Sequence, residues 1–340
     1  MVDYENRVFA QSCETMEQIP DGVVQTCVTS PPYFGLRDYG VDGQIGLEST
    51  VDAYVARLVA VFREVRRTLR DDGVLWLNLG DSYNSGASGG LGGSTLGGGQ
   101  SNQARSNRFG RDIIAGLKPK DLIGIPWRVA FALQADGWWL RSDIIWHKPN
   151  PMPSSVSDRC TSSHEYVFML SKSERYFFDA DAIREPLLSS SIARLAQNGL
   201  AKQNGSERAN GGAKTNGNMK AVYKHDHARQ TSQQLANRVW DDPAALARLV
   251  EQGANKRDVW TIATTPYSDA HFATFPPELP TLCIRAGSRE GDLVLDPFMG
   301  SGTVAEVAEG LGRRWVGYEI NPAYHELIAE RTRQKGLFTR

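Results

Sequence analysis

The sequence lacks the features that define several common classes of protein. Only four of its 340 residues are cysteines, and no two of them form a Cys-x-x-Cys pair. This spacing provides neither a disulfide framework nor a metal site, so we expect reduced cysteines and no bound metal. There is no signal-peptide pattern and no apolar run long enough to span a bilayer, which predicts a cytoplasmic protein without a membrane partner.

Net charge is also nearly absent, since the formal value is -1 at pH 7. The overall charge therefore gives no indication of nucleic-acid binding, and any basic surface must be local. We find no internal repeat. A chain of this length can bury a sizeable core as one large domain or two.

Strand-like and helix-like segments alternate along the chain. We expect strands at 6–11, 23–28, 74–79, 138–147, 165–170, 292–295 and 314–318, and a further strand at 176–178. We expect helices at 14–19, 51–69, 119–135 and 304–311; residues 71–73 are expected to end the second, and Pro126 to kink the third. This alternation predicts an α/β fold with a doubly wound sheet.

Two prolines end the expected strand at 23–28. Pro31 and Pro32 fix their own φ and offer no N–H donor, so the chain stops rigidly there. The strand end presents the Ser30 hydroxyl, backbone carbonyl acceptors and the Tyr33 ring. This set suits a flat ring that carries an exocyclic amino group, but a proline-terminated strand without any chemistry explains the stretch equally well.

A second strand end carries a glycine-rich turn. Residues 296–303 read Asp-Pro-Phe-Met-Gly-Ser-Gly-Thr, and the expected helix follows directly. Gly300 and Gly302 allow close approach of the backbone to a ligand, and the helix start offers N–H groups to a carboxylate. Glu319 ends the next strand, where nucleotide-binding folds hydrogen-bond a ribose. A full Gly-x-Gly-x-x-Gly fingerprint and a Walker lysine are both missing, which argues against a nicotinamide oxidoreductase and a triphosphate site.

Together these stretches resemble the DNA amino-methyltransferases. Residues 30–33 resemble motif IV of that family, a Ser, Asp or Asn followed by Pro-Pro and an aromatic residue. Residues 296–303 resemble motif I, 318–319 motif II, 271–277 motif X and the proline-rich 147–153 the motif VII–VIII region. This order resembles the β arrangement, a circular permutation, which implies a mostly parallel methyltransferase sheet with the motif IV and motif I strands close together.

The resemblance also implies a cofactor, S-adenosyl-L-methionine, and roles for individual residues. Catalysis is expected from Ser30, Pro31, Pro32 and Tyr33. Cofactor binding is expected from Thr274, Phe275, Asp296, Pro297, Phe298, Gly300, Ser301, Gly302, Thr303 and Glu319. One departure lies at 11–13, Gln-Ser-Cys, where related enzymes more often carry Gly-Asp against the adenine ring.

Two polar segments interrupt the motifs. Residues 81–118 form a long Gly-, Ser- and Asn-rich stretch, and residues 184–238 carry nine basic and three acidic side chains, a local charge of about +6. We expect a target-recognition region at 184–256, inserted between catalytic (1–183) and cofactor-binding (257–340) parts of one domain; a disordered basic linker is the alternative. The candidate DNA contacts are Arg37, Arg105, Arg108, Lys148, Lys202, Lys214, Lys220, Lys224 and Arg229.

The resemblance implies an enzyme that methylates double-stranded DNA; whether a separately acting restriction endonuclease accompanies it is left open. Within the family, Ser-Pro-Pro-Tyr favours cytosine N4, with adenine N6 as the alternative and a non-catalytic nucleic-acid-binding protein as a more distant one. A carbon-5 cytosine enzyme would need a Pro-Cys motif, which is absent. The target base must be flipped out of the duplex, and Tyr33 is then expected to stack on it. The oligomeric state is left open.

Overall fold

The computed structural model describes residues 3–36, 38–84, 116–195, 243–264 and 275–333. Its strands are β1 (Arg7–Phe9), β2 (Val24–Thr29), β3 (Leu69–Leu79), β4 (Trp139–His147), β5 (His164–Ser171), β6 (Val259–Thr261), β7 (Leu293–Asp296) and β8 (Arg314–Tyr318). Its helices are α1 (Val51–Thr68), α2 (Ile125–Ala135), α3 (Ser189–Leu195), α6 (Pro243–Gln252), α7 (Glu278–Gly287), α8 (Thr303–Gly310) and α9 (Ala323–Arg333), with a 3-10 turn, η1, at Asp181–Ile183.

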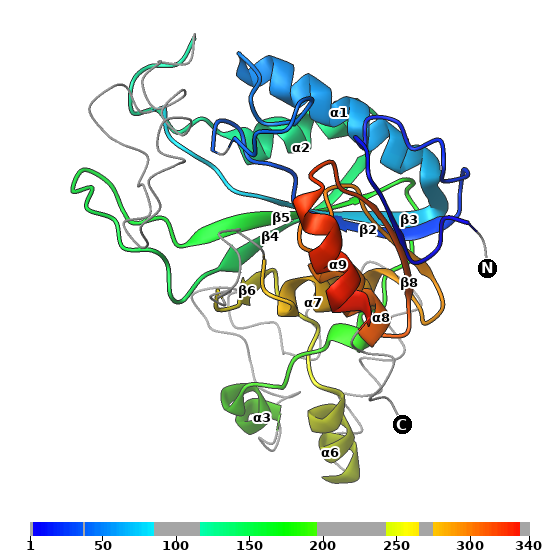
Figure 1. Ribbon diagram of the computed structural model, residues 1–340. Helices are drawn as coiled ribbons and strands as arrows, with labels where there is room; N and C mark the ends of the chain where they lie inside the picture. The colour runs from blue at the N-terminus through cyan, green and yellow to red at the C-terminus, as the bar shows by residue number, and fades with distance from the viewer. Residues whose placement is uncertain (1–2, 37, 85–115, 196–242, 265–274, 334–340) are drawn as a thin grey trace. The chain divides into compact units, whose positions relative to one another are not determined.

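The eight strands form one sheet in the order β1-β8-β7-β2-β3-β5-β4-β6. Every neighbouring pair is parallel except the two pairs made by β5, which runs antiparallel to both β3 and β4. Helices α1 and α2 lie on one side of the sheet and α7 and α8 on the other (Figure 1). The predicted α/β fold with a mostly parallel sheet is therefore confirmed.

Segments far apart in the sequence meet at the centre of this sheet. Strand β2 pairs in parallel with β7, with Cys27 opposite Leu295. At the carboxyl ends of these strands, the Thr29 hydroxyl donates a hydrogen bond of 2.6 Å to Asp296 Oδ1. The predicted proximity of the strands before Ser30 and before Asp296 is confirmed.

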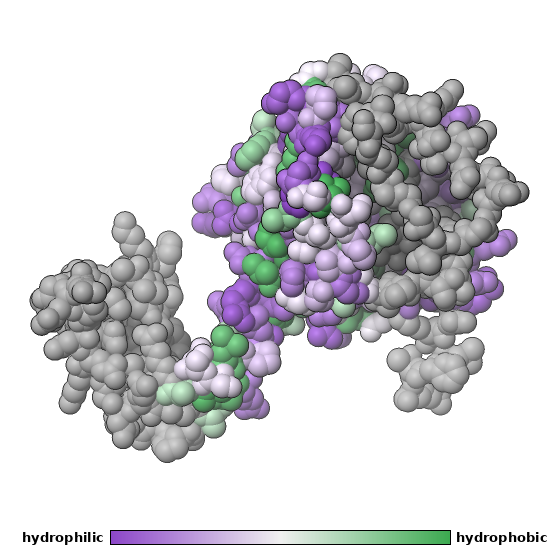
Figure 2. Space-filling view, turned by 90° about the vertical axis from the view of Figure 1, so that its left-hand side faces the viewer, coloured by the Kyte–Doolittle hydropathy of each residue, from purple (hydrophilic) through white to green (hydrophobic). Residues whose placement is uncertain are grey.

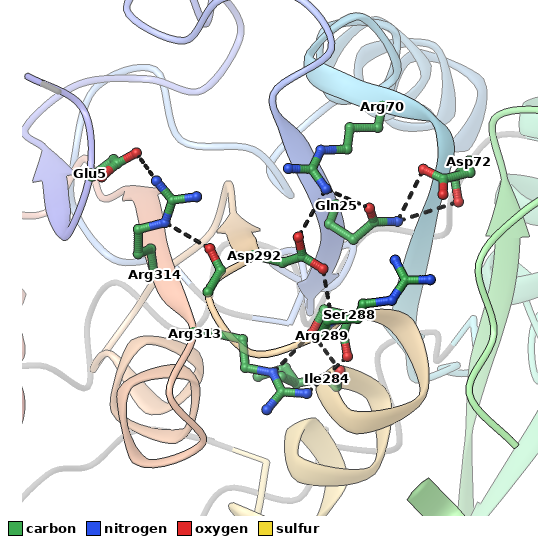
Figure 3. Close-up of polar contacts among 11 residues, drawn as sticks. Glu5, Gln25, Arg70, Asp72, Ile284, Ser288, Arg289, Asp292, Arg313 and Arg314 are labelled. Atoms are coloured by element: carbon green, nitrogen blue, oxygen red, sulfur yellow. Dashed lines mark hydrogen bonds and ion pairs between the residues drawn. The ribbon is translucent and has the colours of Figure 1, made fainter. Parts of the chain in front are cut away.

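A polar network joins the same segments at the opposite ends of the strands (Figure 3). Arg70 Nη1 donates to Gln25 Oε1 at 3.0 Å and pairs with Asp292 Oδ1 at 2.9 Å. Asp292 also accepts the backbone N–H of Arg289 through its other oxygen, at 2.8 Å. This network ties β2 and β3 to the start of β7 and leaves the carboxyl ends of the strands for other contacts.

Helix α1 forms because its apolar residues share one face. Its buried residues are Val51, Tyr54, Leu58, Val61, Phe62, Val65 and Thr68. Thr50 caps the helix by accepting the Ala53 N–H at 3.1 Å.

On the face shown in Figure 2, hydrophilic side chains predominate among the described residues and hydrophobic ones form smaller patches. Among the described residues, no helix has the length and apolar character needed to cross a membrane.

The helix expected at 14–19 is wrong, because this segment forms turns. Arg67 of α1 donates to the Met16 carbonyl at 2.8 Å and to the Ile19 carbonyl at 3.0 Å. The Met16 carbonyl also accepts the Ile19 N–H at 2.9 Å, which closes a single turn, and the Arg67 side chain takes the place of further helical N–H donors. The buried Met16 and Ile19 side chains also hold the segment in place, because they pack into the hydrophobic core.

Three other local expectations need correction. Residues 71–73 do not end the helix, because α1 stops at Thr68 and these residues belong to β3, whose pairing with β2 shifts register between Val24 and Thr26. Pro126 does not kink a helix, because α2 begins at Ile125 and a proline in the first turn loses no hydrogen bond. Residues 176–178 form no strand, although the Phe177 N–H donates to the Asp72 carbonyl at 2.9 Å.

The chain divides into two compact units, Met1–Asp179 with Arg257–Arg340, and Ala180–Lys256. The first unit contains the whole sheet. The second contains η1, α3 and α6. An antiparallel β-bridge between Glu185 and Ala254 joins the beginning and the end of its chain segment. The second unit begins four residues before the segment expected at 184–256.

Candidate active site

A cavity of about 640 Å³ lies in the first unit, where β2, β7 and β8 end. One wall is made by Ser30, Pro31, Pro32 and Tyr33. Another is made by Phe275, Asp296, Pro297, Phe298, Gly300, Ser301, Thr303 and Glu319. The structure thus brings together both sets of residues that the sequence singled out, although some 260 residues separate them in the chain. Of the described candidates for cofactor binding, only Gly302 is not part of the cavity wall.

Asp296 ends β7 with a carboxylate that is almost wholly buried. Its Oδ1 accepts the Thr29 hydroxyl at 2.6 Å and the Phe298 N–H at 3.0 Å. Burial raises the pKa of Asp296 to about 7, against the lowering effect of these two hydrogen bonds. Near neutral pH the cavity wall therefore holds a carboxyl group that a nearby positive charge would readily ionise.

Glu319, one residue beyond β8, is the second acid of this wall. Its two carboxylate oxygens accept the N–H of Gly300 at 2.8 Å and the N–H of Asn321 at 2.7 Å. Burial raises the pKa of Glu319, opposed first by these backbone donors. Each oxygen retains a lone pair for a ligand hydroxyl, so the carboxylate both fixes the glycine-rich turn and faces the cavity.

The glycine-rich turn leads directly into α8. Gly302 precedes the helix at φ +84°, and a Cβ there would lie 3.1 Å from Ile328 Cγ1, so the position needs glycine. No side chain caps the helix start. The buried Ser301 hydroxyl has no hydrogen-bond partner among the residues described. An unpartnered hydroxyl in a cavity wall, beside the start of a helix, suits an anionic or polar ligand group.

The Ser-Pro-Pro-Tyr segment is held from behind by α1. The buried Tyr54 side chain donates its hydroxyl hydrogen bond to the Pro32 carbonyl at 2.8 Å. Pro31 is buried and Ser30 is half-buried against the cavity. Because Tyr54 engages the Pro32 carbonyl, the segment offers the Ser30 hydroxyl and the Pro31 carbonyl as acceptors for a ligand in the cavity.

The Tyr33 ring is fixed on one side by backbone and at its tip by polar groups. A Cβ at Gly80 would lie 2.6 Å from Tyr33 Cε2, so only glycine admits the ring at this distance. The hydroxyl donates to Glu165 Oε2 at 2.7 Å and approaches Asn78 Oδ1 at 3.3 Å. Burial and then the Glu165 carboxylate raise the pKa of Tyr33 well above its ordinary value, so the phenol stays neutral.

We expect Gly80→Ala to destabilise the protein by about 1–3 kcal/mol, because the new methyl group overlaps the Tyr33 ring. Urea denaturation measures the change. In a Tyr33→Ala background, where the ring is gone, the same substitution should cost much less. Equal losses in the two backgrounds would show that the Gly80 effect does not arise from contact with Tyr33.

Several cavity residues were not singled out from the sequence. Asn78 lies near the end of β3, Glu165 is the second residue of β5, and Asn321 lies two residues after Glu319. The 11–13 segment, where the sequence departs from the family pattern, also lines the cavity. Spacing could not reveal Asn78 and Glu165, because their shared partner Tyr33 lies 45 and 132 residues away.

The candidate DNA contacts are mostly not covered by the structure. Arg37, Arg105, Arg108, Lys202, Lys214, Lys220, Lys224 and Arg229, and the cofactor candidate Thr274, lie outside the described residues. Lys148 is described, and it lines the cavity. Its ammonium pairs with Glu165 and lies 4.4 Å from the centre of the Trp146 ring.

The sheet, with the cavity at the carboxyl ends of its strands, has the architecture of an α/β methyltransferase fold. The structure aligns with PvuII DNA methyltransferase (cytosine-N4-specific) at a TM-score of 0.58 and 18% identity, over 96% of this chain and 85% of that one. It aligns with the TTHA0409 protein of Thermus thermophilus, solved with S-adenosyl-L-methionine, at a TM-score of 0.52 and 22% identity, over 96% and 92% of the chains. At such identities the likeness concerns the fold.

Sequence comparison gives the family. The DNA methylase family of N6 and N4 enzymes matches residues 24–330. The chain is 45% identical over 316 residues to the type II methyltransferase M.XycI of Xanthomonas campestris pv. cyanopsidis, covering 93% of this chain and 83% of that protein. It is 42% identical over 324 residues to M.SmaI of Serratia marcescens, covering 95% and 89%. The chain belongs to the N6/N4 DNA methylase family and is a type II DNA methyltransferase.

Proposed function

We propose that this enzyme transfers a methyl group from S-adenosyl-L-methionine to N4 of a cytosine flipped out of double-stranded DNA. The observation that carries the proposal is the single cavity shared by the Ser30–Tyr33 turn and the Asp296–Gly302 turn. The cytosine choice is supported by the Ser-Pro-Pro-Tyr sequence.

The residues of the cavity fit the proposed cofactor. S-adenosyl-L-methionine supplies an electrophilic methyl group on a sulfonium, and it carries an ammonium, a carboxylate and a ribose. Asp296 offers a carboxylate to positive charge, Glu319 offers acceptors to ribose hydroxyls, and Ser301 with the start of α8 offers donors to a carboxylate. The cavity volume lies within the usual range for small-ligand sites.

The residues at the Ser30 end fit an exocyclic amine. The lone pair of such an amine is conjugated into the base, which makes the nitrogen a poor nucleophile. The Ser30 hydroxyl and the Pro31 carbonyl can accept its two N–H bonds, which favours a pyramidal nitrogen with a free lone pair. Tyr33 holds the base plane by stacking, so that much of the rate comes from proximity and alignment.

Covalent catalysis by a thiol is not part of the proposal. Cys27 lies within β2, and Cys13 is buried beside the cavity. Burial raises the pKa of both thiols far above the ordinary value, so neither provides a thiolate at neutral pH. The amine is instead the nucleophile: its nitrogen would take the methyl group as the methyl–sulfur bond breaks, the thioether product would leave, and the extra proton on the nitrogen would pass to solvent.

The decisive experiment is incubation of unmethylated DNA with the enzyme and S-adenosyl-L-methionine, followed by nuclease digestion and mass spectrometry of the nucleosides. We expect N4-methylcytosine. N6-methyladenine would establish the alternative target within the family, and 5-methylcytosine would contradict the amine mechanism. A Ser30→Ala enzyme is the matched control for contaminating activities.

The proposal includes target recognition by residues 184–256, which are rich in Lys, Arg, Asn and Gln and form most of the second compact unit. Basic groups suit phosphates, and amide groups suit base edges. Sequencing of methylated positions in treated genomic DNA gives the recognition site. If a variant with this segment replaced by a Gly-Ser linker methylated the same site, recognition would have to come from elsewhere.

A further inference from the structure

Glu165 occupies the centre of a hydrogen-bonded group in the cavity wall. It is the second residue of β5, where it pairs with Trp146 of β4. Its Oε2 accepts the Tyr33 hydroxyl at 2.7 Å and the Asn78 Nδ2 at 3.1 Å. Its Oε1 pairs with the Lys148 ammonium. Both oxygens of the carboxylate therefore have partners within the protein.

The neighbours of Glu165 are held in their turn. Asn78 is almost wholly buried, and its amide also donates to the Tyr166 carbonyl at 3.1 Å. Lys148 retains only about a fifth of its side-chain exposure (20%) and lies over the Trp146 ring. A charge pair this shielded from water is stronger than one on the surface, and it costs more when one partner is removed.

We infer that Glu165 is a positioning residue for methyl transfer, which orients the Tyr33 ring through its hydroxyl, and that Lys148 is the counter-ion that holds Glu165 in place. This inference rests on the proposed function, because it assigns Tyr33 the task of stacking on the target base. It also gives Lys148 a different role from the phosphate contact expected from the sequence.

The geometry distinguishes positioning from acid–base chemistry. A general base needs an oxygen free to accept a proton from the reacting amine. Oε2 of Glu165 already accepts two donors and Oε1 faces the Lys148 ammonium, whereas Tyr33 has the Cδ2–Cε2–Cζ side of its ring against Gly80 and donates its hydroxyl hydrogen bond to Glu165. The group thus fixes the plane and rotation of the ring, which determine how a base can stack on it.

The test is a double-mutant cycle with Tyr33→Phe and Glu165→Gln, which are nearly isosteric. Single-turnover methyl transfer to DNA should fall about 10- to 100-fold in each variant, since Tyr33→Phe removes a hydrogen bond to a charged group and Glu165→Gln removes the charge itself, on which Tyr33, Asn78 and Lys148 converge. The double variant should be no slower than the slower single variant, and the Kd for S-adenosyl-L-methionine should change less than about threefold. Asp136→Asn, which removes a carboxylate bonded to Arg63 at 2.8 Å, is the matched control and should leave the rate unchanged.

Multiplicative losses in the double variant would overturn the inference, because Glu165 would then act independently of the Tyr33 hydroxyl. An unchanged rate in Glu165→Gln would overturn it as well. Failure of the wild-type enzyme to methylate DNA at all would instead overturn the proposed function.

A readout without catalysis separates these failures. With 3-fluorotyrosine at position 33, ¹⁹F NMR of the full chain should show slow ring rotation and two resolved resonances in the otherwise wild-type protein. In Glu165→Gln the two signals should broaden or merge as rotation accelerates. If the spectrum is the same with and without the Glu165 carboxylate, the carboxylate does not hold the ring.

Lys148 is tested by Lys148→Met, which keeps the apolar stem and removes the charge. A counter-ion role predicts slower methyl transfer with the salt dependence of DNA affinity unchanged. A phosphate contact predicts weaker DNA binding and a smaller slope of log Kd against log salt, by about 1. The second result would remove Lys148 from the inference.

Discussion

Asp296→Asn is expected to stabilise the cofactor-free protein while it weakens binding of S-adenosyl-L-methionine. The carboxylate of Asp296 is almost wholly buried and accepts hydrogen bonds from Thr29 and Phe298, and no cation of the described residues is paired with it. An asparagine oxygen can accept both of those hydrogen bonds without carrying a buried charge. The loss of charge should lower cofactor affinity about 10- to 100-fold, because a charge-assisted contact with the ligand is removed.

The pH dependence follows from the direction of the pKa shift. Burial raises the pKa of Asp296 to about 7 in the folded protein, whereas the unfolded value is about 3.9. The unfolded state therefore releases the proton first as pH rises. For a shift of this size, the free energy of unfolding falls by at most roughly 4 kcal/mol between about pH 4 and pH 7, and it stays at the lower value above pH 7. Asp296→Asn should remove much of this fall.

Urea denaturation at pH 5 and pH 8 measures the effect, and isothermal titration gives the cofactor Kd. The matched control is Asp292→Asn at the start of the same strand, where the carboxylate pairs with Arg70 (Figure 3). That substitution should destabilise the protein at both pH values. If Asp296→Asn destabilised it equally, burial of the Asp296 charge would not carry the cost that we assign to it.

Cofactor binding should itself depend on pH. Ionised Asp296 favours a cationic ligand, and protonation removes that attraction. Below pH 7 we therefore expect affinity for S-adenosyl-L-methionine to weaken by up to about tenfold per pH unit in the wild-type enzyme. The affinity of Asp296→Asn should be nearly constant over the same range.

The sequence predicted the parts of the site that belong to strand ends. Buried strands ended by Pro31 and by the Asp296 turn can be recognised locally, and a parallel sheet brings their carboxyl ends to one edge. Asn78 and Glu165 could not be recognised in this way. Each is an ordinary polar residue in its own strand, and only the antiparallel pairing of β3 with β5 brings both to the Tyr33 hydroxyl.

The errors in the fold have the same origin. The 14–19 segment has the composition of a short helix, but its conformation is set by Arg67 of α1, about 50 residues away. The polar residues at 71–73 were expected to separate a helix from a strand, yet the strand continues through them because β2 pairs on both sides of the irregularity. Local pattern fails where a distant partner decides the backbone conformation.

Ser30→Ala and Tyr33→Ala are expected to lower methyl transfer at least about a hundredfold while the cofactor Kd changes only a few-fold. Tyr33→Ala removes a stacking contact that is worth about 1–3 kcal/mol, and it also frees the base to rotate out of line with the methyl group. Ser30→Ala removes an acceptor for the reacting amine. Rapid-quench single turnovers and cofactor titrations separate the two quantities.

The reverse result is expected on the opposite wall. Glu319→Ala should weaken cofactor binding most, because it deprives both the Gly300 and the Asn321 N–H groups of their acceptor and loosens the turn before α8. At saturating cofactor its transfer rate should recover substantially. The two walls are joined by the hydrogen bond from Thr29 to Asp296, but each is expected to bind a different reactant, the target base on one wall and the cofactor on the other. If Tyr33→Ala and Glu319→Ala both acted only through cofactor affinity, the walls would not have separate roles and the base would have to bind elsewhere.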